Sequence, residues 1–519
     1  MTTFATHGDV LKFLYAAFGI LPRKEAHCAD FDETDKKTLQ TRLARLAKEE
    51  GGLHDNYQSA ADHFCDLLRV YLPTPGHVEE VSMTLSDLDA VYAAMIREEG
   101  TYLPRRESLQ YFISMKAIPN FVLALNRSLL VTGAYAPDGV WSADPFWYLP
   151  TREAGNKWTM PLAKVMRWAY AACDTSQNAF HWPRTRTPKS APVLEQNLGN
   201  AVRWTSGKQL PSLPALIANF KESFAAQEAH GKPVEPALQR RILTALVFAR
   251  VANFLATEVR AHCSDDYLDD VCGQLRQATQ RLQPEVSEFL KEVGPVMDRK
   301  AGPALHLAWL KACMHHEHFL RQKLTLAATT LNELLVASPG QPFPAEALGA
   351  LRRQLGEFAV ATNLDCLKRH EAITIPEGFA GLLFEGIDLR RNPDTTLAQV
   401  DEFEAGARAQ GVHDALCWLF PWLRGVVHYR KDDFTTAFAH YSTAFELAKY
   451  RAGRNQYKLV NQFVELACKN DDARAIRKGV EWAAYIGVQL RWLRDKEASP
   501  ENIEFMRHMM KTANYAHQL

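Results

Sequence analysis

Apolar residues recur along most of this chain at the three- and four-residue spacing of an amphipathic helix. Near the amino end, Val10, Leu11, Leu14 and Phe18 fall on one helical face. Helical runs of the same kind dominate residues 213–336. No alternating apolar and polar pattern competes with these helices, so the sequence predicts an all-α protein.

Residues that begin or break helices divide this pattern into separate elements. Thr84-Leu-Ser-Asp87 has the capping-box pattern, which predicts a helix over residues 85–98. Pro119 predicts a break in a helix over residues 105–131, because proline lacks the backbone N–H. Further helices are predicted over residues 35–49, 56–71, 236–261, 265–281, 283–292, 303–336, 345–370, 378–390, 394–409, 412–429, 432–450, 455–469, 472–491 and 499–515.

Between residues 134 and 161 the helical pattern stops, and prolines, glycines and large aromatic residues replace it. Stacking of nucleobases on these rings is one interpretation. We favour the other, in which the rings pin a long loop to the neighbouring domain, because no dense set of basic residues lies among them. The aromatic residues are Trp141, Phe146, Trp147, Tyr148 and Trp158.

Toward the carboxyl end, short turns separate helices of about 15 residues, at roughly 36 to 40 residues per helix pair. The stretch 422–448 resembles a tetratricopeptide repeat, and a weaker resemblance extends over 376–491. The residues at the family's spacing are Gly425, Phe434, Ala437, Tyr441 and Ala444. The resemblance implies that Gly425 and Ala437 lie where two helices cross and that Tyr441 fills the gap to the next pair. It also implies an α-solenoid whose concave surface binds a protein or peptide.

Residues 194–216 resemble the end of a repressor-type helix-turn-helix domain, in which the recognition helix ends in Trp-x-x-Gly-x-x-x-Pro-Ser. The matching residues are Trp204, Gly207, Pro211 and Ser212. The resemblance implies that Asn197, Asn200 and Arg203 face outward, where amide and guanidinium groups pair with base edges. A corner used only for helix packing is the alternative.

The loop before this segment, residues 181–192, is rich in proline and carries three basic residues without an acidic one. These candidate phosphate contacts are Arg184, Arg186 and Lys189. A surface linker is the alternative, because three charges are few beside the contacts that nucleic-acid-binding proteins make.

Two further motifs suggest metal chemistry but fit structural roles better. Tyr267-Leu-Asp-Asp270 resembles the Tyr-x-Asp-Asp motif of reverse transcriptases, yet it lies where we expect the acidic first turn of a helix. Cys313 and His316 share one helix face, whereas His315 and His318 share another. Two ligands on a face are fewer than a tetrahedral zinc site needs, so we predict no metal site and no cofactor.

The composition limits the remaining possibilities. Hydrophobic residues make up 47% of the chain, and 60 basic residues balance 60 acidic ones, which removes the simplest argument for nonspecific binding to nucleic acid or membranes. Nine scattered cysteines fit a reducing compartment, and no apolar run of about 18 residues predicts a membrane span. We expect a cytoplasmic protein.

The motifs of hydrolases, nucleotide-binding enzymes and zinc proteases are missing, so we expect no enzymatic activity.

Together these patterns predict four regions. They are an N-terminal helical domain (1–133), an aromatic and proline-rich connector with the helix-turn-helix-like segment (134–225), a helical hairpin region (226–340) and a tetratricopeptide-like repeat domain (341–519). We expect a non-enzymatic regulator that binds a protein or peptide partner in the C-terminal repeat groove, with double-stranded DNA as a second candidate partner. The alternative is a pure protein-protein interaction scaffold or a subunit of a larger bacterial assembly.

Overall fold

The computed structural model describes residues 13, 15–20, 41, 53–72, 75–98, 109–132, 145–183, 191–294, 302–338, 341–370, 378–493 and 498–512. Within these residues the chain is almost wholly α-helical. The strands there, β1 (Thr151–Arg152) and β2 (Trp158–Thr159), form one antiparallel hairpin. The predicted all-α class is therefore confirmed. The helix predicted over residues 35–49 lies outside the described residues, apart from Thr41.

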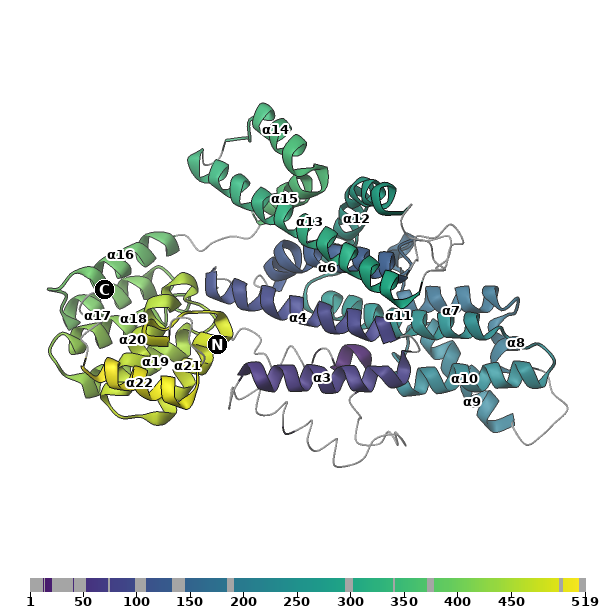
Figure 1. Cartoon of the computed structure of the whole chain (residues 1–519), viewed down its shortest axis with the longest axis horizontal. Helices are drawn as coiled ribbons and strands as arrows, with labels where there is room; N and C mark the ends of the chain where they lie inside the picture. Colours follow the sequence, from purple (N-terminus) through teal and green to yellow (C-terminus); the bar gives the residue numbers. More distant parts are fainter. Residues whose placement is uncertain are drawn as a thin grey trace.

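The described helices form three parts of an elongated molecule (Figure 1). The central part contains α3 (Leu53–Tyr71), α4 (Pro75–Glu98), η1 (Phe112–Ala117), α6 (Ile118–Thr132), α12 (Asp265–Val293), α13 (Pro303–Ala337), α14 (Ala345–Leu355) and α15 (Glu357–His370). One end contains α7 (Pro161–Ala172), α8 (Gln177–His181), α9 (Ala191–Thr205) and α10 (Leu213–Ala229), and α11 (Pro236–His262) joins this end to the central part. The other end, which we call the carboxyl-terminal array, contains α16 (Phe379–Arg391), α17 (Leu397–Ala409), α18 (Leu419–Tyr429), α19 (Phe434–Ala448), η5 (Gly453–Asn455), α20 (Gln456–Lys469), α21 (Ala473–Ile486), η6 (Arg491–Leu493) and α22 (Pro500–Thr512).

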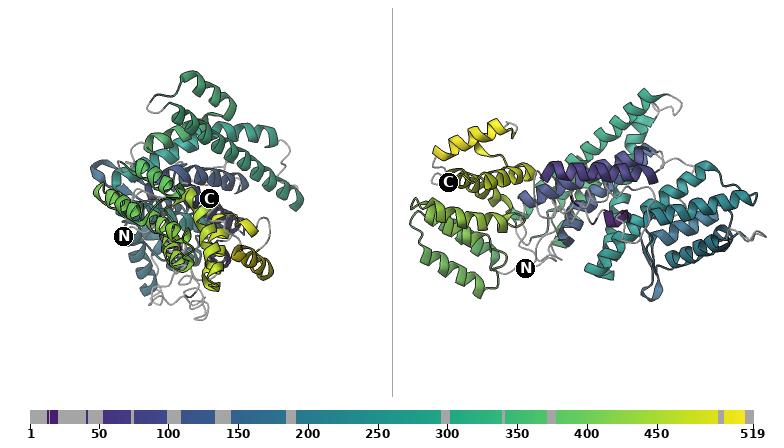
Figure 2. Two further views of the ribbon diagram at one scale, coloured as in Figure 1. Left: turned by 90° about the vertical axis from the view of Figure 1, so that its left-hand side faces the viewer. Right: turned by 90° about the horizontal axis from the view of Figure 1, so that it is seen from below.

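Two buried apolar clusters hold these parts together. One cluster contains residues of α3 and α4, of the end formed by α7–α11, and of the carboxyl-terminal array. The other contains residues of α6 and of α11–α15. Views along two further directions show α3 and α4 running between the two ends of the molecule (Figure 2). Both cores therefore combine segments that are far apart in the sequence.

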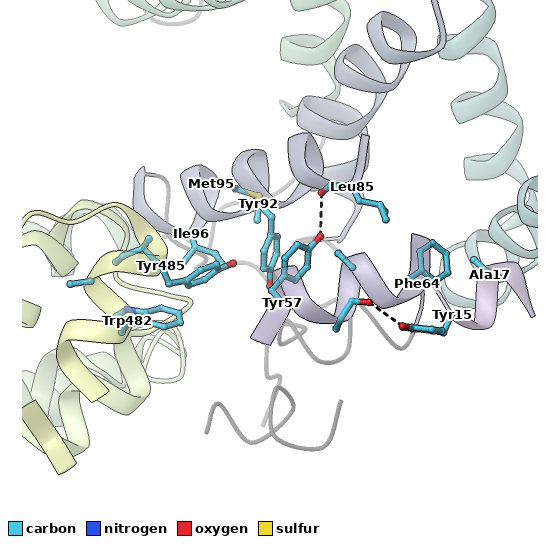
Figure 3. Packing of buried hydrophobic residues seen from close by; sticks show 14 of the residues in the cluster. Tyr15, Ala17, Tyr57, Phe64, Leu85, Tyr92, Met95, Ile96, Trp482 and Tyr485 are labelled. Atoms are coloured by element: carbon cyan, nitrogen blue, oxygen red, sulfur yellow. Dashed lines mark hydrogen bonds between the residues drawn. The ribbon is translucent and has the colours of Figure 1, made fainter. Parts of the chain in front are cut away.

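Aromatic and amide side chains connect the central helices to the carboxyl-terminal array (Figure 3). The hydroxyl of Tyr57 on α3 donates to the carbonyl of Leu85 on α4 at 3.2 Å, and Tyr485 of α21 lies beside this pair. Gln456, at the start of α20, donates from Nε2 to the carbonyl of Ile96 at 2.9 Å. These residues are buried, so the array is packed against α3 and α4 by a continuous core.

A cluster of charged side chains joins α4, α6 and α13. Arg127 donates from Nε to Glu80 Oε2 at 2.9 Å and from Nη1 to Glu317, and all three side chains are buried. Arg321 contacts Glu317 Oε1 at 2.6 Å and Asp87 Oδ2 at 3.0 Å on the solvent side. The cluster fixes three helices from distant parts of the chain at one point.

A buried histidine is hydrogen bonded on both ring nitrogens at the end formed by α7–α10. Nδ1 of His181 lies 2.8 Å from Ser223 Oγ, and Nε2 lies 2.9 Å from the hydroxyl of Tyr170. The Ser223 hydroxyl itself donates to the carbonyl of Asn219 at 2.8 Å. Ser223 therefore accepts from Nδ1, and Nε2 accepts from Tyr170, which is the pattern of a neutral ring. Burial lowers the pKa of His181 from 6.5 to about 3.

This histidine predicts a loss of stability in acid. Below about pH 6.5 the unfolded chain protonates this ring while the folded protein does not, so the free energy of unfolding falls by up to about 1.4 kcal/mol per pH unit until the folded pKa is approached. Urea unfolding followed by circular dichroism at several pH values will measure this slope. His181→Gln is expected to be less stable at neutral pH but to show a shallower slope. An equal slope in both proteins would contradict the assignment.

Several predicted helix boundaries are wrong. Residues 109–132 remain helical through Pro119, where a break was predicted, and the helix predicted over 412–429 begins only at Leu419. Thr84 does not start a helix, because α4 is continuous and the Thr84 hydroxyl donates to the carbonyl of Glu80 at 2.8 Å, one turn back. Residues 265–292 form one helix, α12, with Pro284 inside it. The helix predicted over 345–370 is divided by Gly356, whose φ of +88° ends α14 and favours glycine.

The described part of the aromatic connector, from residue 145 onward, packs against the helices, in line with the favoured interpretation. Phe146, Trp147 and Tyr148 are partly buried against the two cores. The centre of the Trp158 ring lies 6.0 Å from the guanidinium of Arg152 and 5.7 Å from that of Arg260. Trp141 lies outside the described residues.

Helix α11 is the one described helix whose length and composition would allow it to cross a membrane. However, 56% of its apolar window is buried inside the protein. It packs against α7, α10 and α12. Burial of this kind is typical of a helix in the interior of a helical protein, and it explains the apolar composition.

Candidate partner-binding surface

Helices α18 and α19 cross at a glycine. A Cβ atom added to Gly425 would lie 2.5 Å from Cδ2 of Tyr441 and 3.4 Å from the carbonyl oxygen of Ala437. Ala437, Tyr441 and Ala444 are fully buried, and Phe434 packs edge-on against Tyr429. The two helices can approach this closely because Gly425 has no side chain. The five residues that carry the resemblance are therefore packing residues in this structure.

Polar side chains between α18, α19 and α20 form hydrogen bonds with one another. Gln462 Oε1 on α20 accepts from Trp422 Nε1 at 2.8 Å and from the Tyr441 hydroxyl at 3.1 Å. The hydroxyl of Tyr429 donates to Glu465 at 2.6 Å. All of these residues are buried, as is α20 from Leu459 to Cys468 apart from half-buried Asn461. A partner therefore has no access to the faces that α18 and α20 turn toward each other.

Two more glycines mark close helix approaches in the array. A Cβ on Gly386 of α16 would lie 2.5 Å from Leu419 Cδ2, and one on Gly479 of α21 would lie 2.5 Å from Val464 Cγ2. Gly386 lies in the weaker part of the resemblance, but Gly479 was missed. The only signal for Gly479 in the sequence is a glycine inside a helical pattern.

Basic side chains gather where α16 ends and α20 begins. We call Arg390, Arg391, Arg430, Lys458 and Arg491 the basic surface. Arg390 is buried, with its guanidinium 5.0 Å from the ring centre of Trp422. Arg430 donates to the carbonyls of Asn392 at 2.5 Å and of Arg390 at 2.7 Å. Arg391 is exposed, whereas Arg430, Lys458 and Arg491 are half-buried.

The basic surface carries unfavourable charge within itself. Burial lowers the pKa of Lys458, and the neighbouring charges of Arg390, Arg391 and Arg491 lower it further. Burial also lowers the pKa of Arg390, to which Arg391 and Arg430 add repulsion against a favourable effect of Tyr441. The array therefore holds like charges together at a fixed place. Sequence reasoning missed this surface, because its residues come from three separate helices and η6.

The helix-turn-helix-like corner is formed. Trp204 is buried, Gly207 has a φ of +71° and reverses the chain, and the Ser212 hydroxyl accepts from the amide of Ala215 at the start of α10. The carbonyl of Pro211 accepts from Nε of buried Arg250 at 2.9 Å. The corner therefore contributes to the core. This is what the alternative interpretation, a corner used only for helix packing, requires.

The expectation that Asn197 faces outward is wrong. Its side chain is 6% exposed, and its Nδ2 donates to Glu222 Oε2 at 2.8 Å. Its side-chain oxygen accepts from Asn219 at 3.2 Å, because this face of α9 packs against α10. Asn200 is half-buried, and Arg203 is exposed and donates to Asn200 Oδ1 at 2.6 Å. The other candidates, Arg184, Arg186 and Lys189, lie outside the described residues.

The zinc candidates do not converge. Cys313 points into the core, where burial raises its pKa to about 12. His316 stacks on Phe289 with ring centres 4.1 Å apart, and burial, followed by the charge of Lys323, lowers its pKa to about 4. Among the described residues, no group of three or more histidine, cysteine, aspartate or glutamate side chains could hold a metal ion.

Asp265 and Asp266 form the acidic first turn of α12, whereas Asp269 and Asp270 of the motif lie one turn further along the helix. The Ser264 hydroxyl accepts from the amide of Tyr267 at 3.0 Å and caps this helix. Asp265 pairs with Arg260 at 2.5 Å, and Asp266 pairs with Arg152 at 2.7 Å. Of the two motif carboxylates, Asp269 lies 3.8 Å from Arg152 and Asp270 lies 3.3 Å from Arg369, so both pair with arginines.

No protein-family model, curated protein or solved structure matches this chain. The resemblance to tetratricopeptide repeats therefore depends on the residues of 422–448 and on the helix crossing they form.

Proposed function

We propose that this chain is a non-enzymatic helical protein that binds a protein or peptide partner through its carboxyl-terminal array. The observation that carries the proposal is the basic surface, because the chain as a whole is electrically neutral and yet holds these charges together on a packed framework. Rigid surfaces of this kind bind with little loss of conformational freedom. A role as a scaffold within a larger assembly fits these features better than a role on DNA.

The observations on α9 argue against DNA recognition. One of the three base-reading candidates, Asn197, is buried, and the outer face of this helix exposes Val193, Val202 and the acidic Glu195. We expect a DNA duplex to bind weakly and Arg203→Ala to change that binding by less than about twofold. A steep dependence on salt that Arg203→Ala reduces would favour the DNA regulator instead.

Site-specific crosslinking tests the proposal. A photoreactive phenylalanine analogue replaces Phe384, which is 69% exposed on α16, and in a matched control it replaces Phe319, which is 52% exposed on α13. Irradiation in cell extract is expected to give a discrete crosslinked protein from position 384 alone. That protein is then identified by mass spectrometry, purified and titrated against the full chain. Crosslinking only from position 319, or a purified product that does not bind, would refute the proposal.

A further inference from the structure

One side of α13 faces outward along nearly the whole helix. Its exposed residues recur at three- and four-residue spacing from Ala304 to Ala337, so they form a single stripe on a helix about 50 Å long. The opposite side of α13 packs against α6, α14 and α15 in the central part (Figure 1). We call this exposed stripe, from Ala304 to Ala337, the α13 face.

Large apolar side chains stand out from the α13 face. Leu307, Met314, Phe319 and Leu326 are each between 43% and 52% exposed. The ring of Phe319 is held in place by Lys323, whose Nζ lies 4.6 Å from the ring centre. Apolar side chains that gather on one exposed stripe are typical of an interaction surface.

Few charges accompany these apolar side chains. Among the described side chains of α13, the exposed ones with a formal charge are Lys311 and Glu333, and neither has an ion-pair partner in the described part of the chain. A helix side that faces water permanently is usually charged along its length. The exposed side of α12 follows this rule, with Asp266, Asp269, Asp270, Glu288, Lys291 and Glu292. The α13 face departs from it, as expected of a surface that another surface covers.

We infer that the α13 face binds the same face of a second copy of this chain, with the two helices antiparallel. Lys311 and Glu333 each lie eleven residues from Gln322, on opposite sides of it. A twofold axis at Gln322 therefore brings Lys311 of each copy opposite Glu333 of the other. A parallel pair would place like charges together instead. Because this charge complementarity lies within one face, it favours a second copy over an unrelated protein.

The apolar residues and the central amide fit the same axis. Phe319 lies three residues before Gln322 and Leu326 lies four residues after it, so Phe319 of each copy lies beside Leu326 of the other. Gln322 meets the Gln322 of the second copy, and two amide groups can donate to and accept from each other. A single amide side chain in the seam of a coiled coil fixes the register of the two helices.

Sedimentation equilibrium of the full chain tests the inference. The chain of 58.5 kDa is expected to reach twice this mass with a dissociation constant in roughly the micromolar range, because one helix pair makes a small interface. Lys311→Glu is expected to raise this constant more than about fivefold, and Lys311→Glu combined with Glu333→Lys is expected to restore it to within about twofold. The matched control, Lys221→Glu, makes the same charge change at an exposed position of α10 and is expected to leave the constant unchanged.

A neutral variant tests the apolar contact. Phe319→Ser combined with Leu326→Ser leaves the net charge unchanged and is expected to keep the chain monomeric where the natural chain is paired. All of the changed side chains are exposed, and thermal unfolding checks that each variant is folded. A chain that stays monomeric at every concentration would overturn the inference and leave the α13 face to a different occupant. A dimer that Lys311→Glu weakens no more than Lys221→Glu does, or that the exchanged charges do not restore, would also overturn it.

This inference goes beyond the proposed function and does not depend on it, because α13 lies in the central part and not in the array. Crosslinking in cell extract uses the chain at nanomolar concentration, where a pair of micromolar affinity is dissociated, so Phe319 remains a valid control there. A dimer without any captured partner refutes the proposed function alone. A captured partner together with a monomeric chain refutes the dimer alone.

Discussion

Arg127→Ala is expected to lower the free energy of unfolding by about 3–5 kcal/mol. Arg127 is buried between Glu80 of α4 and Glu317 of α13, and it is the group that contacts both carboxylates. Burial raises the pKa of Glu80, and the charge of Arg127 opposes that rise. Without Arg127, Glu317 would still pair with Arg321, but the buried Glu80 carboxylate would lose its counter-ion and would have to take up a proton or draw in water.

Urea unfolding followed by circular dichroism will measure this loss. The control is Arg69→Ala, which removes an exposed pair with Asp66 on α3 and is expected to cost less than about 1 kcal/mol. Because burial already raises the pKa of Glu80, this carboxyl is expected to take up a proton in the variant, and the deficit should be smaller in mild acid than at neutral pH. Similar losses for Arg127→Ala and Arg69→Ala would mean that the buried cluster does not stabilise the fold.

Some features that depend on local sequence were predicted well, although local signals such as the capping-box pattern at Thr84 also misled. Helix α20 was expected over residues 455–469 and spans Gln456–Lys469, because its apolar residues keep the helical period. The Gly207 turn after Trp204 was also expected, because a chain reversal directly after a helix favours glycine. Both features are determined within a few residues.

Features that depend on partners far along the chain could not be predicted. Arg127 lies 47 residues from Glu80 and 190 from Glu317, so no sequence window contains the cluster. The orientation of Asn197 depends on the position of α10, because the face of α9 that becomes buried is the one that meets Asn219. Lys458 likewise shows no special feature until the end of α16 is placed beside it.

Trp482→Ala is the second large effect that we expect, with a loss of about 3–5 kcal/mol in the free energy of unfolding. The side chain of Trp482 is 1% exposed and packs edge-on against Tyr450 with ring centres 5.3 Å apart. Its Nε1 donates to Gln456 Oε1 at 2.9 Å, and Gln456 in turn donates to Ile96 of α4. Removal of the ring would leave a cavity in α21 and an unpaired amide oxygen at the junction with α4.

The junction gives this prediction a second measurable result. Because Gln456 links Trp482 to the carbonyl of Ile96, the alanine variant should increase hydrogen exchange at the end of α4 as well as in α21. Trp482→Phe keeps much of the ring and loses the hydrogen bond, so it should cost only about 1–2 kcal/mol. If the alanine variant speeds exchange in α21 and leaves α4 unchanged, the array and the central helices are stabilised independently. If both respond, a partner that binds the array can also stabilise α3 and α4, because one core joins them.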